Sequence, residues 1–216
     1  YVNKKTQEEY IIPDWLSSMG NKLKIFRTED YGSVTKIAPT LLRESDPDTI
    51  IIVCDDDLVY HSDMVAEQVI NQSKFDNCAV GYDGIRVKKG IFNDVRGHYF
   101  TSNRMDAEVR VLQGYKTVSY RRKYFDQDFF DDFIDKSWAD DIVLSAYMAS
   151  RGIKKMVTYH KDDSIFNSLE EWQERGGVET FPVLRHTHHE SREGCNLMRH
   201  EGINQDNPWL WKFIDR

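Results

Sequence analysis

The sequence has little cysteine and no long apolar run. Its three cysteines, Cys54, Cys78 and Cys195, form no C-x-x-C pair. A disulfide framework is therefore not expected, and this usage is typical of a reducing compartment such as the cytoplasm. No run of about 18 apolar residues occurs, so we expect no helical membrane span.

An excess of basic residues is also missing. The 216 residues contain 29 Lys and Arg against 36 Asp and Glu, giving a formal net charge of −7. A general nucleic-acid-binding protein needs a basic face to meet phosphates, so nucleic acid is not an expected partner. A nucleotide ligand stays possible, because one metal ion and a few cationic side chains can hold a diphosphate locally.

The chain shows no signal peptide, internal repeat or linker. Its first residues, Tyr1 to Asn3, do not resemble a natural start, and we expect the natural protein to begin earlier. The length suits one domain spanning residues 1–216. The oligomeric state is left open.

Strand-like and helix-like stretches alternate, which predicts an α/β domain with a mixed, mostly parallel sheet flanked by helices. The clearest strand is Thr49–Cys54, an apolar, β-branched run typical of a central strand covered on both faces. The other expected strands are Lys22–Phe26, Ala79–Tyr82, Val109–Leu112, Thr117–Tyr120 and Met156–Tyr159, and the expected helices are Ile12–Leu16, Thr35–Arg43, Asp63–Asn71 and Asp140–Gly152.

Three consecutive aspartates, Asp55, Asp56 and Asp57, follow the clearest strand directly. Ligands of α/β sheets bind at the carboxyl ends of strands, and three like charges there repel one another unless a cation is present. Asp55 and Asp57, two residues apart, can point to the same side and share one Mn²⁺ or Mg²⁺ ion, while Asp56 points elsewhere within this cofactor-binding segment. The alternative is a solvated acidic turn or a helix cap.

The segment IIIVCDDDLVYHSDMV resembles the DxD segment of GT-A fold glycosyltransferases. DYGSVTKIAPTLLRESDPDT resembles the loop and helix that precede that strand, and WADDIVLSAYMASRG resembles the acidic helix start that carries a catalytic carboxylate in inverting members. The resemblance covers roughly residues 1–160, except that the usual first strand and donor-binding loop are absent or reduced.

The resemblance implies a single GT-A domain that moves a hexose from a nucleoside diphosphate sugar, expected to be a UDP-sugar, to a hydroxyl of a glycan or glycoconjugate. Asp141 is favoured as the general base of an inverting reaction, and Asp140 is the second candidate. We expect one of the pair to cap its helix and only one to face the active edge. In a retaining enzyme Asp141 binds sugar or acceptor hydroxyls instead.

Lys36 lies near the start of a helix, where its ammonium can meet phosphate or sugar oxygens; a solvated surface lysine is the alternative. The late histidines His186, His188 and His189 can supply a further metal ligand, with His186 and His188 favoured over His189. A solvated loop or an acceptor contact is equally open for them.

An aromatic stretch precedes the Asp140 helix and can form core or line an acceptor site. It comprises Tyr115, Tyr120, Tyr124, Phe125, Phe129 and Phe130. Two other functions stay open: a sugar-phosphate nucleotidyltransferase, and a non-catalytic module that binds nucleotide or carbohydrate. The first usually has a Gly-rich basic motif near its start, and the second tolerates loss of Asp141.

Overall fold

The structure is a computed structural model that describes residues 11–55, 58–86, 98–101, 106–135, 139–159, 167–168 and 208–214. It is a mixed α/β fold, as the sequence predicts. Among the described residues, no helix has both the length and the apolar character needed to span a membrane.

The main sheet has five strands in the order β1-β8-β3-β9-β6. They are β1 (Ile50–Val53), β8 (Val118–Arg121), β3 (Cys78–Gly81), β9 (Lys154–Val157) and β6 (Ala107–Glu108). The sheet is mixed, but the expectation of a mostly parallel sheet is wrong. Only β3 and β9 pair in parallel, because β8 runs antiparallel to both β1 and β3, and β6 runs antiparallel to β9.

The predicted strand at Thr49–Cys54 exists, but its central position is wrong. Within the described residues β1 is an outer strand, paired with β8 alone. Its burial alternates accordingly: Ile51 and Val53 are buried, whereas Ile50 and Ile52 are only partly so. The predicted strand Lys22–Phe26 is also wrong, since this stretch forms no strand and exposes both Ile25 and Phe26.

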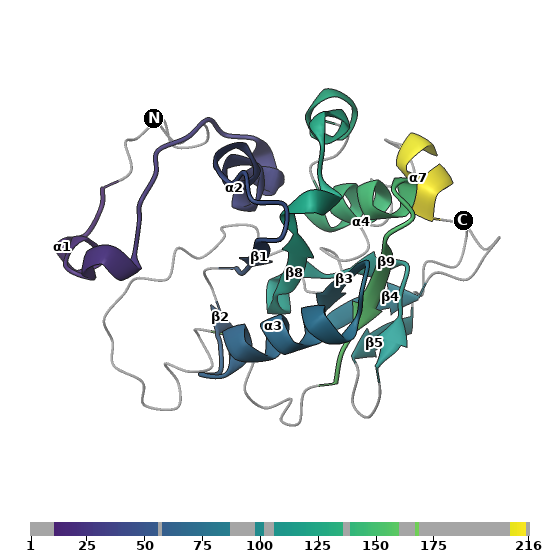
Figure 1. Cartoon of the computed structure of the whole chain (residues 1–216), viewed down its shortest axis with the longest axis horizontal. Helices are drawn as coiled ribbons and strands as arrows, with labels where there is room; N and C mark the ends of the chain where they lie inside the picture. Colours follow the sequence, from purple (N-terminus) through teal and green to yellow (C-terminus); the bar gives the residue numbers. More distant parts are fainter. Residues whose placement is uncertain are drawn as a thin grey trace.

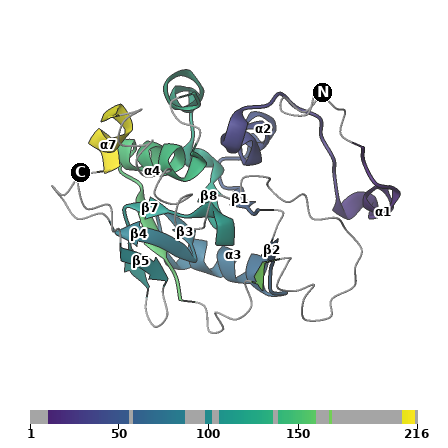
Figure 2. The same ribbon diagram turned by 180° about the vertical axis from the view of Figure 1, so that it is seen from behind.

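Two long helices cover opposite faces of the main sheet (Figures 1 and 2). Helix α3 (Met64–Lys74) packs on one face, and α4 (Asp140–Ser150) packs on the other. Because successive side chains of a strand point to opposite faces, Ser119 of β8 meets α3, whereas Tyr120 lies on the α4 side. Both helices begin close to where their sequence patterns predict.

Shorter elements complete the described chain. The helical ones are α1 (Asp14–Ser17), η1 (Gly20–Lys22), η2 (Gly32–Lys36), α2 (Ala38–Arg43), η3 (Gly114–Lys116), η4 (Arg122–Tyr124), the π-helical turn η5 (Phe129–Phe133) and α7 (Pro208–Ile214). A three-stranded sheet joins β5 (His98–Thr101), β4 (Asp83–Arg86) and β7 (Val111–Leu112), and β10 (Asn167–Ser168) pairs with β2 (Leu58–Val59).

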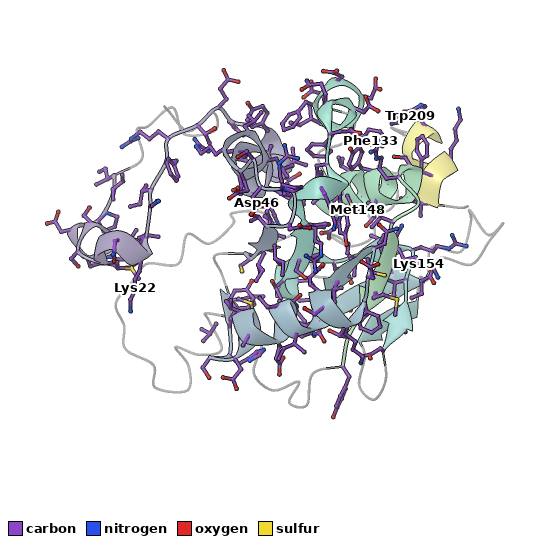
Figure 3. All side chains as sticks on the ribbon, viewed as in Figure 1. Lys22, Asp46, Phe133, Met148, Lys154 and Trp209 are labelled. Carbon is purple, nitrogen blue, oxygen red and sulfur yellow. The ribbon has the colours of Figure 1, made fainter. Side chains whose placement is uncertain are left out.

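The aromatic stretch before α4 is mostly core. Phe129 and Tyr147 are fully buried with ring centroids 5.1 Å apart, and Phe125 stacks on Tyr147 at 5.5 Å. Phe133 extends this packing to Trp209 of α7, whose ring centroid lies 4.8 Å away (Figure 3). These rings pack α7 and η5 against α4.

Candidate functional site

The ends of several strands lie side by side at one end of the main sheet, which we call the sheet edge. Val53, the last residue of β1, pairs with Val118, the first residue of β8, and Val118 also pairs with Gly81 at the end of β3. Asp55 follows β1, and the turn η3 precedes β8, so both lie at this edge. Side chains from distant parts of the sequence can therefore meet here.

Lys36 connects two carboxylates at this edge. Its ammonium nitrogen Nζ lies 2.6 Å from Asp55 Oδ1 and 2.9 Å from Asp140 Oδ2. The three residues come from η2, from the loop after β1 and from the first position of α4. All three side chains are largely buried, with 22%, 28% and 16% of the Lys36, Asp55 and Asp140 side chains exposed.

The two carboxylates decide the charge of Lys36. Partial burial alone would lower the pKa of its ammonium, but the Asp140 charge and the hydrogen bonds to Asp55 and Asp140 raise it above its ordinary value. Lys36 therefore stays protonated, and the alternative of a solvated surface lysine is wrong, since its side chain is largely buried and ion-paired. The geometry shows that Asp55 and Asp140 both direct an oxygen at one positive charge.

Asp141 meets the same edge from the second position of α4. Its Oδ1 accepts a hydrogen bond of 2.7 Å from the backbone N–H of Gly114 in η3. A Cβ at position 114 would lie 3.1 Å from that oxygen and 3.6 Å from Lys36 Nζ, so a glycine here lets the backbone approach the carboxylate. We call Lys36, Asp55, Asp140 and Asp141, gathered around Gly114, the carboxylate site.

Crowding changes the proton affinity of Asp141. Burial raises the pKa of Asp141, and the neighbouring Asp140 charge raises it further. The Gly114 N–H and the Lys36 charge oppose the rise without cancelling it, so the pKa reaches about 7. A carboxylate with such a pKa can accept and release a proton near neutral pH.

The expectation that one aspartate caps α4 and that only one faces the active edge is wrong. Ala139 occupies the cap position, and it makes no side-chain capping hydrogen bond. Asp140 instead pairs with Lys36, and Asp141 accepts from Gly114. Both aspartates therefore face the sheet edge, where the helix dipole of α4 favours their negative charge.

The loop around η3 is fixed to the end of β1. The Tyr60 hydroxyl accepts from the Asp55 N–H at 2.8 Å and lies 2.9 Å from the Tyr115 carbonyl, to which it can donate. Thr117 donates its hydroxyl to the Val53 carbonyl at 2.8 Å. Its φ of 107° is unfavourable for a β-branched residue, which places backbone strain beside the carboxylate site.

A second acidic group lies at the same edge. Asp83 begins β4 and is buried, with 3% of the residue exposed. Its Oδ2 accepts from the Tyr115 hydroxyl and lies 3.7 Å from Lys116 Nζ. The sequence pattern did not predict the positions of Asp83, Tyr60 and Gly114 at this site. Only Gly114 carried a local signal, as a glycine between two predicted strands.

Some predicted site residues lie outside the described residues: Asp56, Asp57, His186, His188 and His189. Their placement relative to Lys36 and Asp55 is therefore not part of the site described above. Within the residues that are described, no group of three or more His, Cys, Asp or Glu side chains gathers around a point suited to a metal ion.

Comparison with known proteins adds no relative: a scan against protein-family models and a search of curated proteins both find no match to this chain.

Proposed function

We propose that this chain is a metal-dependent glycosyltransferase that moves a hexose from a nucleoside diphosphate sugar, a UDP-sugar in the first instance, to a hydroxyl of a glycan or glycoconjugate. One observation carries the proposal. Asp55, at the carboxyl end of β1, and Asp141, at the start of α4, converge with Lys36 around Gly114. This unites a metal-ligand candidate, a proton acceptor and a cation at one sheet edge.

The donor groups suit a divalent cation. Asp55 and Asp140 each place a carboxylate oxygen within 3 Å of one positive charge, that of Lys36. Hard cations such as Mn²⁺ or Mg²⁺ take oxygen ligands of this kind. Asp55, together with Asp57 from the undescribed part of the triplet, would hold the ion, and one of the late histidines is a further candidate. The ion would stabilise the negative charge of the leaving diphosphate.

Asp141 fits the role of general base. In the inverting reaction, the acceptor hydroxyl oxygen forms a bond to the anomeric carbon while the bond from that carbon to the diphosphate oxygen breaks. The hydroxyl proton passes to Asp141, and the nucleoside diphosphate leaves with the bonding electron pair. The raised pKa of Asp141 matches this task, since a base works best with a pKa near the operating pH.

Lys36 has a separate role in this scheme. Its ammonium offsets part of the negative charge of Asp55 and Asp140 in the free protein, so the carboxylates can be held close together without a metal. When an ion and a diphosphate bind, the same ammonium can turn to a phosphate oxygen, because its flexible stem carries a compact charge.

The test is a donor screen. Purified protein is incubated with UDP-sugars and GDP-sugars, with and without Mn²⁺, and the released nucleoside diphosphate is measured. Release from one donor that requires Mn²⁺ supports the proposal. Binding of the donor without release points to a non-catalytic module, whereas release of inorganic pyrophosphate from a nucleoside triphosphate and a sugar phosphate indicates a nucleotidyltransferase.

A matched pair of variants assigns the metal to Asp55. Asp55→Asn should abolish Mn²⁺-dependent binding of UDP in calorimetry, because the amide keeps the shape but loses the charge. Asp48→Asn is the control, since the Asp48 side chain is 69% exposed and pairs with Lys123 away from the site. Equal Mn²⁺-dependent affinity for UDP in both variants would mean that Asp55 is not a metal ligand.

A further inference from the structure

Tyr115 differs from the other aromatic residues that precede α4. Tyr120, Tyr124, Phe125 and Phe129 are all buried, with at most 3% exposed, and form core. Tyr115 is 37% exposed and lies in η3, next to Gly114 of the carboxylate site. Core packing therefore explains the other rings but leaves the exposure of this one unexplained.

The Tyr115 side chain is held in place at its far end. Its hydroxyl donates to Oδ2 of the buried Asp83, an oxygen that also lies 3.7 Å from Lys116 Nζ. The Lys116 ammonium lies 5.6 Å from the Tyr115 ring centroid, within cation–π range. With the hydroxyl occupied, the side chain can offer a ligand its ring rather than its polar end.

The backbone of Tyr115 is fixed to the carboxylate site. Its carbonyl lies 2.9 Å from the Tyr60 hydroxyl, which in turn accepts from the N–H of Asp55. The preceding residue, Gly114, donates to Asp141. The ring is therefore held in one position relative to both Asp55 and Asp141. Because the Tyr115 side chain is already ordered, stacking of a ligand on it costs little side-chain entropy.

We propose that Tyr115 is the surface on which a pyranose ring of the substrate stacks. This inference rests on the proposed function and adds the residue that positions the sugar. A pyranose presents C–H groups on its faces, and the face of an aromatic ring carries partial negative charge, so the two attract. A ring fixed beside Asp55 and Asp141 would set the distance between the sugar and the reacting groups.

The pyranose can belong to the donor or to the acceptor, and binding measurements separate the two. The variants are Tyr115→Leu, which removes the ring, and Tyr115→Phe, which keeps the ring but loses the hydrogen bond to Asp83. Tyr159→Leu is the control, because Tyr159 is also an exposed tyrosine at this sheet edge, 43% exposed, but it follows β9, whereas Tyr115 precedes β8. Thermal unfolding verifies that each variant is folded.

For each variant, the affinities for UDP and for the UDP-sugar chosen by the donor screen are measured by calorimetry with Mn²⁺, and the acceptor KM is measured by turnover. If the donor sugar stacks on Tyr115, Tyr115→Leu weakens UDP-sugar binding about tenfold while UDP binding changes less than about twofold. If the acceptor sugar stacks there, the acceptor KM rises about tenfold and both donor affinities stay constant. Tyr115→Phe keeps most of the affinity in either case.

If Tyr115→Leu has wild-type affinities for UDP and UDP-sugar and a wild-type acceptor KM, the inference is overturned and the proposed function stays intact. Equal losses in Tyr115→Leu and Tyr115→Phe would also overturn it, since they would assign the effect to the Asp83 hydrogen bond rather than to the ring. A wild-type protein that binds no nucleotide sugar would instead refute the proposed function, and this inference with it.

Discussion

Two polar clusters lie on the main sheet and differ in kind. Between α3 and the sheet, Gln68, Gln72 and Ser119 form an amide network in which Gln72 Nε2 donates to the Cys78 and Ser119 carbonyls at 3.1 and 2.9 Å. Ser119 donates to Gln68 Oε1 at 2.7 Å. All of these side chains are neutral and buried.

The carboxylate site, in contrast, gathers three acids and one lysine at the sheet edge, where each remains partly exposed. Neutral groups joined by hydrogen bonds can be buried at little cost, whereas crowded charges oppose one another. The amide network therefore suits a role in stability, whereas under the proposed function the carboxylate site serves binding and proton transfer. Four predictions test this difference, in order of decreasing effect.

The largest effect is expected from Asp141→Asn. The amide keeps the hydrogen bond from Gly114 but cannot accept a proton, so turnover should fall by about 10² to 10⁴ while donor affinity stays near wild type. Asp132→Asn, an exposed position in η5, is the control and should retain full turnover. Near-normal turnover in Asp141→Asn would transfer the role to Asp140 or favour a retaining mechanism.

Gln72→Leu should act on stability instead. The change removes the Gln72 donor from the buried Ser119 and Cys78 carbonyls, although Cys78 keeps the Tyr124 hydroxyl, and this should lower the free energy of unfolding by about 2 to 3 kcal/mol. The thermal midpoint should then fall by roughly 5 to 10 °C, with UDP affinity unchanged in the folded protein. Gln127→Leu, on an exposed residue, should leave the midpoint nearly constant. A loss of UDP affinity in the Gln72 variant would contradict the division between the clusters.

Lys36→Met should change metal affinity in an unusual direction. Without the ammonium, Asp55 loses its competing cation, so Mn²⁺ should bind about tenfold more tightly in the absence of nucleotide. UDP should bind more weakly, because its diphosphate loses a cationic partner. Lys154→Met, whose side chain is 64% exposed in wild type, should alter neither affinity. Weaker Mn²⁺ binding in Lys36→Met would show that the lysine organises the carboxylates rather than competing for them.

The smallest effect concerns pH and stability. The pKa of Asp141 is about 7 in the folded protein and about 3.9 when unfolded, so the folded state holds the proton more tightly. The stabilising contribution is present below about pH 4 and is lost as pH rises through 7. Asp141→Asn removes this dependence, so in metal-free buffer its thermal midpoint should exceed that of wild type at pH 8, and by less at pH 4.

This difference is measured by scanning calorimetry at the two pH values. If Asp141→Asn raises the thermal midpoint more at pH 4 than at pH 8, folding lowers the pKa of Asp141 instead of raising it. Because Asp141→Asn is also the variant with the largest expected loss of turnover, a stabilised but inactive protein would indicate that the charge at this site is kept for function.

The sequence by itself determined the features that depend on local periodicity. The β-branched run of β1, the start of α4 at Asp140 and the position of Asp55 directly after a strand all follow from residues close in the chain. Hydrophobic spacing reports the period of an element and the side that it buries, and these are local properties. Four of the five strands of the main sheet and its two covering helices needed the structure mainly for their bounds, whereas β6 was not predicted and the predicted strand Val109–Leu112 corresponds to β7 of the three-stranded sheet.

Only the tertiary structure decided which elements are neighbours. The sequence gives no sign that β8 lies antiparallel between β1 and β3, because apolar strands read alike whatever their direction. It likewise could not reveal that Lys36 joins Asp55 to Asp140, or that Asp141 meets Gly114. Such contacts join residues far apart in the chain, and they exist because strand pairing and helix packing bring those residues to one edge of the sheet.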